Sequence, residues 1–321
     1  RDLLKFLLTV SPFYNLKLKI TELLGELYLI DHNIDFDNYD LIIIEDIEIL
    51  PIILKYKKNA KILCDLREFY PLQHENNIKF NILERNYKYL LCKHFLSSCD
   101  AIITVSEGIS NFFKNWFNLK PQVIMSCPYF IDIAPSKNIS NTIKMVHHGA
   151  PNRDRKLERM IEIFQFLDER FYLDFYLVNY YNRKYIEHLK KIAEPFQKIR
   201  FLNPVSFNDI IPTMNKYDIG LYLLEPTGIN TKHALPNKFF EYIQARLMIA
   251  IGPSIEMEKL VLKYKLGIVS KTFKPKDLAN LLNDLTNEDI WKYKINSDNA
   301  SHELCFEKES KKLLKIIEEI I

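Results

Sequence analysis

Short runs of aliphatic and β-branched residues alternate along this chain with longer segments whose apolar residues recur every three or four positions. That alternation is typical of α/β proteins, in which helices join the strands of parallel sheets. Six runs in the second half suffice for a doubly wound sheet, but four in the first half are few, so we expect further strands upstream of residue 1. The predicted strands are 40–44, 61–65, 101–105, 122–126, 144–148, 171–178, 199–202, 218–224, 248–251 and 266–270.

Helical periodicity occupies the intervals between these runs. Leucines at positions 3, 4, 7 and 8 follow the helical spacing, so residues 2–10 are predicted as a helix rather than a strand. The predicted helices cover 2–10, 80–97 and 107–116, then begin near Asp154, Asn182, Ser206, Pro236, Ile255 and Pro275, and end with 303–321.

The two series of strands are separated by residues 126–144, which hold two prolines and no apolar period, and we interpret this segment as a linker. A chain of 321 residues also exceeds the usual size of one domain. We therefore predict an N-terminal Rossmann-like domain over residues 1–135, a C-terminal Rossmann-like domain over residues 143–300, and a C-terminal helix over residues 301–321.

Charge and cysteine content narrow the class of protein. The 44 basic and 41 acidic residues give a net charge of +3, which does not favour nucleic acid as a partner. Five cysteines, none in a C-x-x-C pair, indicate neither a disulfide framework nor a zinc site and fit a reducing compartment. No apolar run approaches the ~20 residues of a spanning helix, and residues 1–10 lack the features of a signal peptide. We expect a cytoplasmic protein.

The clearest candidate chemistry lies at the start of a predicted helix in the second half. Pro236 suits a first helical turn, and the free N–H groups and dipole of such a turn attract phosphate. Lys238 adds a cation, and Glu241 lies on the same helical face as Asn237, where its carboxylate can accept both hydroxyls of a ribose. The alternative is an ordinary surface helix with a Lys238–Glu241 pair.

The stretch PNKFFEYIQARLMIAIG from Pro236 and the preceding YDIGLYLLEPT from Tyr217 resemble the donor-site motif of family 4 (group 1 type) glycosyltransferases. That family has the GT-B fold, two Rossmann-like domains facing across a cleft, and the resemblance spans roughly residues 40–270. It implies that Glu241 binds the ribose of a nucleotide-sugar donor and that the helix start contacts the diphosphate. It also implies that the final helix packs back on the N-terminal domain. The donor-binding positions are His233, which replaces an acid of the family, with Pro236, Asn237, Lys238 and Glu241.

A second cluster follows the predicted strand 144–148. The segment VHHGAPNRDRK contains Gly149, which permits close backbone approach, and Arg153, Arg155 and Lys156, whose charges can face an anion. The family has a glycine and a basic pair at this place. The resemblance therefore implies that Gly149, Arg153 and Lys156 bind the donor and neutralise the leaving diphosphate, with Lys156 also catalytic. A solvated helix start is the alternative.

The first half of the chain contains the candidate residues for binding the acceptor. YDLIIIEDIEILPIIL and AKILCDLREFYP resemble the acceptor domain of the same family, and Asp46, Asp65, Arg67 and Glu68 match its catalytic positions. All four follow predicted parallel strands, and open α/β sheets bind ligands beyond the carboxyl ends of their strands. Helix capping and local ion pairs are the competing interpretation for Asp65, Arg67 and Glu68.

Two further patterns bear on cofactors and partners. Asp35-Phe36-Asp37 reads as a D-x-D metal motif, but it precedes a strand, so we interpret it as turn acids and expect no divalent metal and no other cofactor. A helix dipole and basic side chains would then stabilise the departing diphosphate. Residues 80–95 mix Arg85, Lys88 and Lys93 with aromatic residues, which suggests either core packing or peripheral contact with the inner face of a membrane.

Taken with the resemblance, these patterns predict a retaining, metal-independent glycosyltransferase of the hexosyltransferase type. It would transfer a sugar from a nucleoside diphosphate sugar to a glycan or lipid-linked acceptor in surface-polysaccharide synthesis. A nucleotide-sugar 2-epimerase shares the fold and is one alternative. A non-catalytic accessory subunit of a glycosyltransferase complex is another, suggested by His233 and the short first domain. The nucleotide base, the sugar and the acceptor stay open.

Overall fold

The structure is a computed structural model and describes residues 4, 5, 16, 17, 19–21, 23, 24, 36–137, 140–178 and 182–321, with the Asp37 side chain left aside. Most of the predicted helix 2–10 and Asp35 of the D-x-D motif lie outside the described residues. The chain divides into two compact units. The N-terminal unit contains Arg1–Met125, Gly228–Ala234 and Ser310–Ile321, and the C-terminal unit contains Ser126–Thr227 and Leu235–Glu309.

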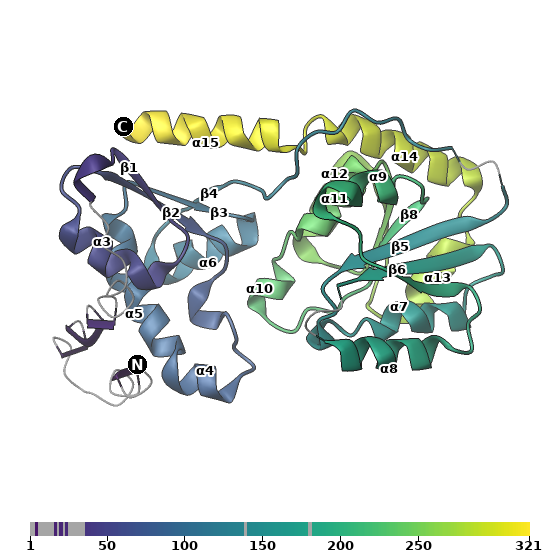
Figure 1. The fold of residues 1–321 in the computed structure, drawn as a ribbon, viewed down its shortest axis with the longest axis horizontal. Helices are drawn as coiled ribbons and strands as arrows, with labels where there is room; N and C mark the ends of the chain where they lie inside the picture. The colour runs from purple at the N-terminus through teal and green to yellow at the C-terminus, as the bar shows by residue number, and fades with distance from the viewer. Residues whose placement is uncertain are drawn as a thin grey trace. The chain divides into compact units, whose positions relative to one another are not determined.

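The N-terminal unit is built on a four-stranded parallel sheet (Figure 1). Its strands occur where the hydrophobic runs predict them, since β-branched residues favour the extended backbone. In spatial order they are β1 (Leu41–Ile44), β2 (Lys61–Leu66), β3 (Ala101–Thr104) and β4 (Gln122–Val123).

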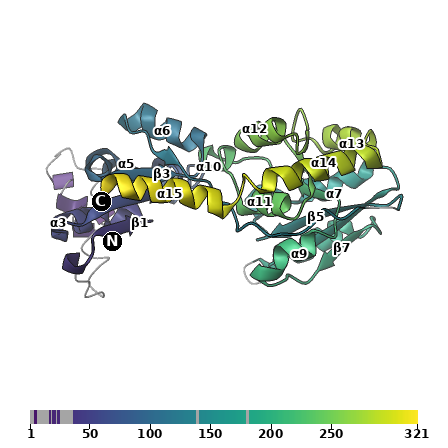
Figure 2. The same ribbon diagram turned by 90° about the horizontal axis from the view of Figure 1, so that it is seen from above.

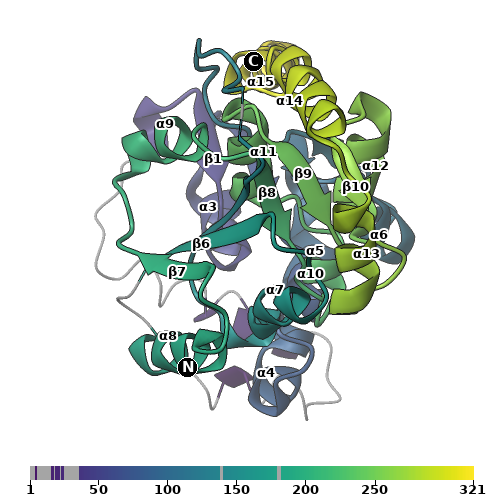
Figure 3. The ribbon, with the colours of Figure 1, turned by 90° about the vertical axis from the view of Figure 1, so that its right-hand side faces the viewer.

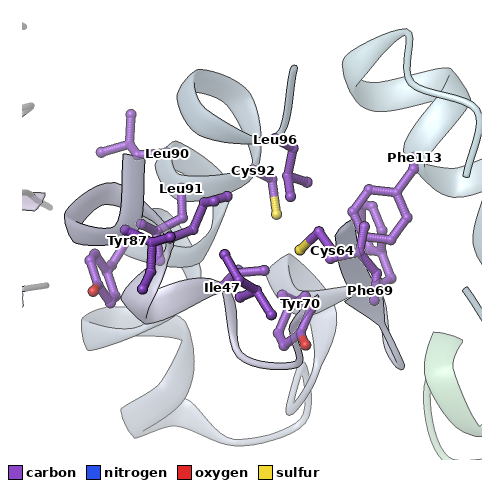
Figure 4. Packing of buried hydrophobic residues seen from close by; sticks show 14 of the residues in the cluster. Ile47, Cys64, Phe69, Tyr70, Tyr87, Leu90, Leu91, Cys92, Leu96 and Phe113 are labelled. Carbon is purple, nitrogen blue, oxygen red and sulfur yellow. The ribbon is translucent and has the colours of Figure 1, made fainter. Parts of the chain in front are cut away.

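Side chains of β2 alternate between two apolar clusters. Cys64 belongs to the main core, together with Phe69, Tyr87 and Phe113 (Figure 4). Leu63 belongs to a smaller cluster on the other face, which includes Ile316 of the last helix, so that this helix lies along the sheet (Figure 2). The helices of this unit are α3 (Leu50–Tyr56), α4 (Ile78–Leu83), α5 (Arg85–Phe95), α6 (Glu107–Phe117), α10 (Ile229–Lys232) and most of α15 (Phe306–Ile320).

The single helix predicted over 80–97 is two helices, α4 and α5, which meet at Glu84. Within α5, Lys88 is buried and its Nζ lies 2.8 Å from Oε1 of the buried Glu48. Lys88 therefore contributes to the core of the unit and not to a basic outer face. No helix among the described residues is long and apolar enough to cross a membrane.

The C-terminal unit contains a six-stranded parallel sheet with helices on both faces (Figure 3). Helices α9, α11 and α14 lie on one face, and α7, α8 and α13 lie on the other. In spatial order the strands are β10 (Gly267–Val269), β9 (Met248–Ile251), β8 (Ile219–Tyr222), β5 (Ile143–Gly149), β6 (Phe171–Leu177) and β7 (Ile199–Leu202). The helices are α7 (Glu158–Glu162), α8 (Arg183–Ala193), α9 (Ile210–Met214), α11 (Asn237–Gln244), α12 (Ile255–Tyr264), α13 (Pro275–Asn283) and α14 (Asn287–Ser301).

The order of these strands positions the candidate site. From β5 the chain adds β6 and β7 on one side, and it then returns to place β8 on the other side of β5. The connections leaving β5 and β8 consequently diverge, with α7 and α11 on opposite faces of the sheet (Figure 3). Doubly wound sheets bind their ligands at such a switch point.

Candidate functional site

The switch point joins the end of β5, the end of β8 and the start of α11. Gly149 is the last residue of β5 and has a φ of +114°, a conformation that favours glycine. A Cβ on this residue would lie 2.9 Å from Nζ and 3.3 Å from Cε of Lys238. The Lys238 side chain therefore passes directly over the end of β5, and only the absence of a side chain at position 149 leaves room for it.

Lys238 is a cation without an acidic partner. Among the described residues, no carboxylate lies within ion-pair distance of its Nζ, which lies 5.8 Å from the centre of the Tyr222 ring. Burial, with the charge of Arg155 as a second cause, lowers the pKa of Lys238 to about 8. A desolvated ammonium group that no described carboxylate contacts has unused capacity to bind an anion.

The first turn of α11 adds backbone donors to this cation. Pro236 precedes the helix with extended backbone angles, and no side chain caps the helix start. Asn237 is exposed and occupies the first helical position. The N–H groups of such a turn have no partner within the helix, and together with the dipole they attract anions.

Glu241 lies one turn further along α11, beside the end of β5. Its Oε2 is 3.3 Å from Nε2 of His148, and both side chains are buried. Burial lowers the pKa of His148 to about 3, with the charge of Lys238 contributing, so the imidazole is neutral at neutral pH. Burial also raises the pKa of the Glu241 carboxyl, and Lys238 opposes that rise. The carboxylate is thus held beside a neutral ring and near an unpaired cation.

The three basic residues of the turn after β5 point to different partners. The Arg155 guanidinium donates to the Tyr222 hydroxyl at 2.8 Å, which brings its charge toward Lys238. The Lys156 Nζ lies 3.3 Å from Oε2 of Glu225, and the Arg153 guanidinium lies 5.6 Å from the centre of the Tyr185 ring. Arg155, absent from the predicted site, is therefore the turn residue that shares its surroundings with Lys238.

No sequence signal separates Arg155 from its two basic neighbours. Lys156 has a φ of +50°, so the backbone turns sharply after Arg155 and the directions of the side chains change from one residue to the next. The predicted site did not include Glu225 either. It follows β8 and accepts from Arg159 at 2.6 Å as well as from Lys156.

The predicted acceptor residues do not all come together. Arg67 lies 2.6 Å from Glu45 and 3.8 Å from Asp65, so these three form one charged group at the carboxyl ends of β1 and β2. Burial raises the pKa of Asp65. Asp46 instead accepts from the backbone N–H of Glu48 at 3.0 Å and caps a short 3-10 helix.

Two further predicted residues stand apart from these groups. Glu68 makes no hydrogen bond or ion pair within the described part of the chain. His233 lies in Gly228–Ala234, a segment that belongs to the N-terminal unit, whereas Lys238 and Glu241 belong to the C-terminal unit. Its ring centre is 5.6 Å from that of Phe112, and its carbonyl accepts from Ser106 at 2.8 Å.

Metal-binding residues do not gather in the described part of the chain. Among the residues that the structure describes, no group of three or more His, Cys, Asp or Glu side chains could hold a metal ion.

No family model matches the sequence, and no curated protein matches it either. Solved structures do match. HepE of Anabaena, in complex with UDP and glucose, gives a TM-score of 0.69 at 12% identity over 96% of this chain and 84% of its own. TarM of S. aureus, in a complex that includes UDP, gives 0.66 at 12% identity over 94% of this chain. A glycosyltransferase from Rickettsia africae gives 0.63 at 16% identity, covering 97% of this chain and 83% of its own.

These likenesses establish the fold. The chain spans 58% of the length of TarM. At 10–16% identity the shared feature is the architecture, an α/β protein with two parallel sheets as in the two-Rossmann-domain GT-B fold. The predicted fold class is confirmed in this respect.

Proposed function

We propose that this chain is a glycosyltransferase whose C-terminal unit binds the diphosphate of a nucleotide sugar at the start of α11. The observation that carries the proposal is Lys238, a partly buried cation that lies over Gly149 at the switch point and makes no ion pair with a carboxylate among the described residues. Only an anion from outside would complete such a site. Arg155 and the backbone N–H groups of α11 supply further donors for the same anion.

Glu241 would hold the ribose of the same nucleotide. Its carboxylate lies one helical turn beyond Lys238, and an ionised carboxylate can accept two hydroxyl hydrogen bonds. The neutral His148 ring lies beside this carboxylate, with its Nε2 3.3 Å from Oε2. UDP is the first nucleotide to test, because the structures of HepE and TarM named above contain UDP.

The same cations suit the chemistry of sugar transfer. An acceptor hydroxyl oxygen would bond to the anomeric carbon while the bond from that carbon to the phosphate oxygen breaks and the hydroxyl proton leaves. Negative charge then develops on the diphosphate, and fixed cations beside it stabilise the transition state. We assign the main electrostatic role to Lys238 and Arg155, and a supporting role to Arg153 and Lys156. We propose that transfer retains the anomeric configuration and needs no divalent metal.

The acceptor would bind the N-terminal unit. Asp65, with its raised pKa and its place beside Arg67 and Glu45, is the candidate to accept the hydroxyl proton. We propose a glycan or lipid-linked glycan acceptor of surface-polysaccharide synthesis, reached in the cytoplasm at the inner face of a membrane. Asp46 has a capping contact, so its role would be to shape the loop after β1.

The decisive test measures nucleotide binding first and product second. Calorimetry with UDP, GDP, ADP and CMP should give micromolar binding for one of them, and Lys238→Met should weaken it by about 10- to 100-fold. Incubation with the matching donor alone then separates two enzymes, because an epimerase converts the donor and a transferase needs an acceptor. No measurable affinity for any of the nucleotides would reject the proposal and favour an accessory subunit.

A further inference from the structure

A cavity of about 280 Å³ lies within the N-terminal unit, and none of Glu45, Asp65 and Arg67 is among its lining residues. Its wall comes from the segment after β2 and from α4, α5 and α6. Its volume is just below the range of about 300–1,000 Å³ for pockets of drug-sized ligands, which suits one small ring. The lining residues are Pro71, Asn81, Arg85, Asn86, Tyr89 and Trp116.

One wall of this cavity is aromatic and held in place. Trp116 packs edge-on against Phe69, with ring centres 5.2 Å apart, and against Tyr89 at 6.3 Å. Tyr89 in turn packs against Phe117 at 5.4 Å. Although anchored on these sides, Trp116 is 41% exposed. The open aromatic surface is thus rigid before any ligand arrives, which lowers the entropic cost of binding.

The rest of the wall is mostly polar. Arg85 is exposed, and within the described residues no carboxylate pairs with it. The Asn81 amide is anchored, since its Nδ2 donates to the Glu75 carbonyl at 2.7 Å, but its buried Oδ1 has no hydrogen-bond partner. The second amide, Asn86, also lines the cavity. Amides and a guanidinium offer both donors and acceptors, and the guanidinium can bind a carboxylate with two parallel hydrogen bonds.

An aromatic face, two amides and a guanidinium that pairs with no described carboxylate surround a space for one ring, and this set matches the chemistry of a sugar acid. We propose that this cavity binds a uronic acid residue of a saccharide. The C–H face of the pyranose ring packs on Trp116, and Arg85 binds the carboxylate. The site does not depend on the proposed transferase activity, so its failure leaves the nucleotide site untouched.

Fluorescence gives a direct test, because the chain has only two tryptophans. In Trp291→Phe protein, the emission reports Trp116 alone. Methyl β-D-glucuronide should change that emission saturably, and methyl β-D-glucoside should bind about 10-fold or more weaker, since it lacks the carboxylate that pairs with Arg85. Arg85→Gln should weaken the glucuronide by about 10-fold and leave the glucoside unchanged. The matched control is Lys79→Gln, which removes an exposed charge of α4 that does not line the cavity.

A second measurement does not rely on emission. Saturation transfer from the protein to the ring protons of the glucuronide should be present in the natural chain and absent in Trp116→Ala. No saturable response to either sugar, or equal losses in Arg85→Gln and Lys79→Gln, would overturn the proposal. A blue shift of Trp116 with phosphatidylglycerol vesicles and no response to sugars would also overturn it, because Ile78 and Ile82 of α4 are exposed and would then mark a membrane contact.

Discussion

The Lys238 side chain occupies the space that a Cβ would need at Gly149: a Cβ there would lie 2.9 Å from the Lys238 Nζ. These two residues lie 89 positions apart in the sequence, and they meet because β5 ends where α11 begins. A glycine at the end of this strand and a lysine in the first turn of this helix therefore form one structural feature. Its consequences can be tested residue by residue.

Gly149→Ala should weaken nucleotide binding and lower stability. The φ of +114° strains any residue with a Cβ, and the methyl group would push Lys238 away from its position. Strain of this kind costs about 1–3 kcal/mol. Thermal unfolding and calorimetry with UDP measure the two effects.

The double-mutant cycle with Lys238→Ala is the control for that substitution. Once the lysine is shortened, the clash is gone and only the backbone strain stays. The loss of stability caused by Gly149→Ala should then be smaller than in the natural chain. Equal losses in both backgrounds would mean that the two side chains do not compete for space.

Nucleotide affinity should fall as the pH rises through about 8, the pKa of Lys238. Above that pH the amine loses the charge that attracts the diphosphate, although the bound anion itself raises the pKa and shifts the fall upward. UDP titrations at pH values between 6 and 10 would show this fall in affinity. In Lys238→Met the affinity should depend less on pH. A profile that is identical in both proteins would contradict the role of this amine.

In the unliganded protein, the stability that depends on Lys238 should rise with pH, whereas nucleotide affinity falls. Its folded pKa is lowered below its usual value of 10.5, so between about 8 and 10.5 the unfolded state binds more protons. Stability from this group therefore rises with pH across that window. Lys238→Met should be more stable than the natural chain at neutral pH, with the difference shrinking toward pH 10. The free energy of unfolding of both proteins is measured in urea at each pH. Subtracting one from the other cancels the contribution of other lysines, such as Lys294.

Glu241→Ala should reduce UDP affinity by about 10- to 100-fold without unfolding the protein, because two hydrogen bonds to an ionised acceptor are lost. The ligand 2′-deoxy-UDP is the matched probe. It should bind the natural chain more weakly than UDP does, and it should bind Glu241→Ala as well as UDP does. A preference for UDP that persists in the variant would place the ribose elsewhere.

Arg155→Met should lower turnover more than Lys156→Met. Arg155 shares its surroundings with Lys238, whereas Lys156 is exposed and lies beside Glu225. We expect a loss of about 100-fold for the first, as for a removed transition-state donor, and only a few-fold for the second. Turnover of both variants is measured with a saturating donor. A larger loss in Lys156→Met than in Arg155→Met would mean that Lys156 is the main cation.

Lys88→Met alone should destabilise the N-terminal unit by at most about 3–5 kcal/mol, since it removes the 2.8 Å partner of the buried Glu48 and leaves that carboxylate with Lys5 at 3.9 Å. The double substitution with Glu48→Met should recover much of that loss. Chemical denaturation is the measurement. A negligible loss of stability in Lys88→Met would mean that this lysine is not part of the core and would favour a membrane-facing role for it.

The sequence by itself determined where the strands lie and where α11 starts. Runs such as 199–202 and 248–251 became β7 and β9 with the same bounds, because short runs rich in aliphatic and aromatic residues favour the extended backbone of a buried strand. Pro236 marked the helix start to within one residue, since proline restricts its own backbone and that of its neighbour.

Only the tertiary structure decided which charged side chains meet. The lysine in the middle of α5 became a core residue because Glu48, 40 positions earlier, faces it. Arg155 was separated from Arg153 and Lys156 by a backbone turn that residue spacing does not encode, and His233 lies against Phe112 through a segment that joins the N-terminal unit. Strand patterns are local, whereas ion pairs and anion sites depend on directions and distances that exist only after the sheet order brings β5, β8 and α11 together.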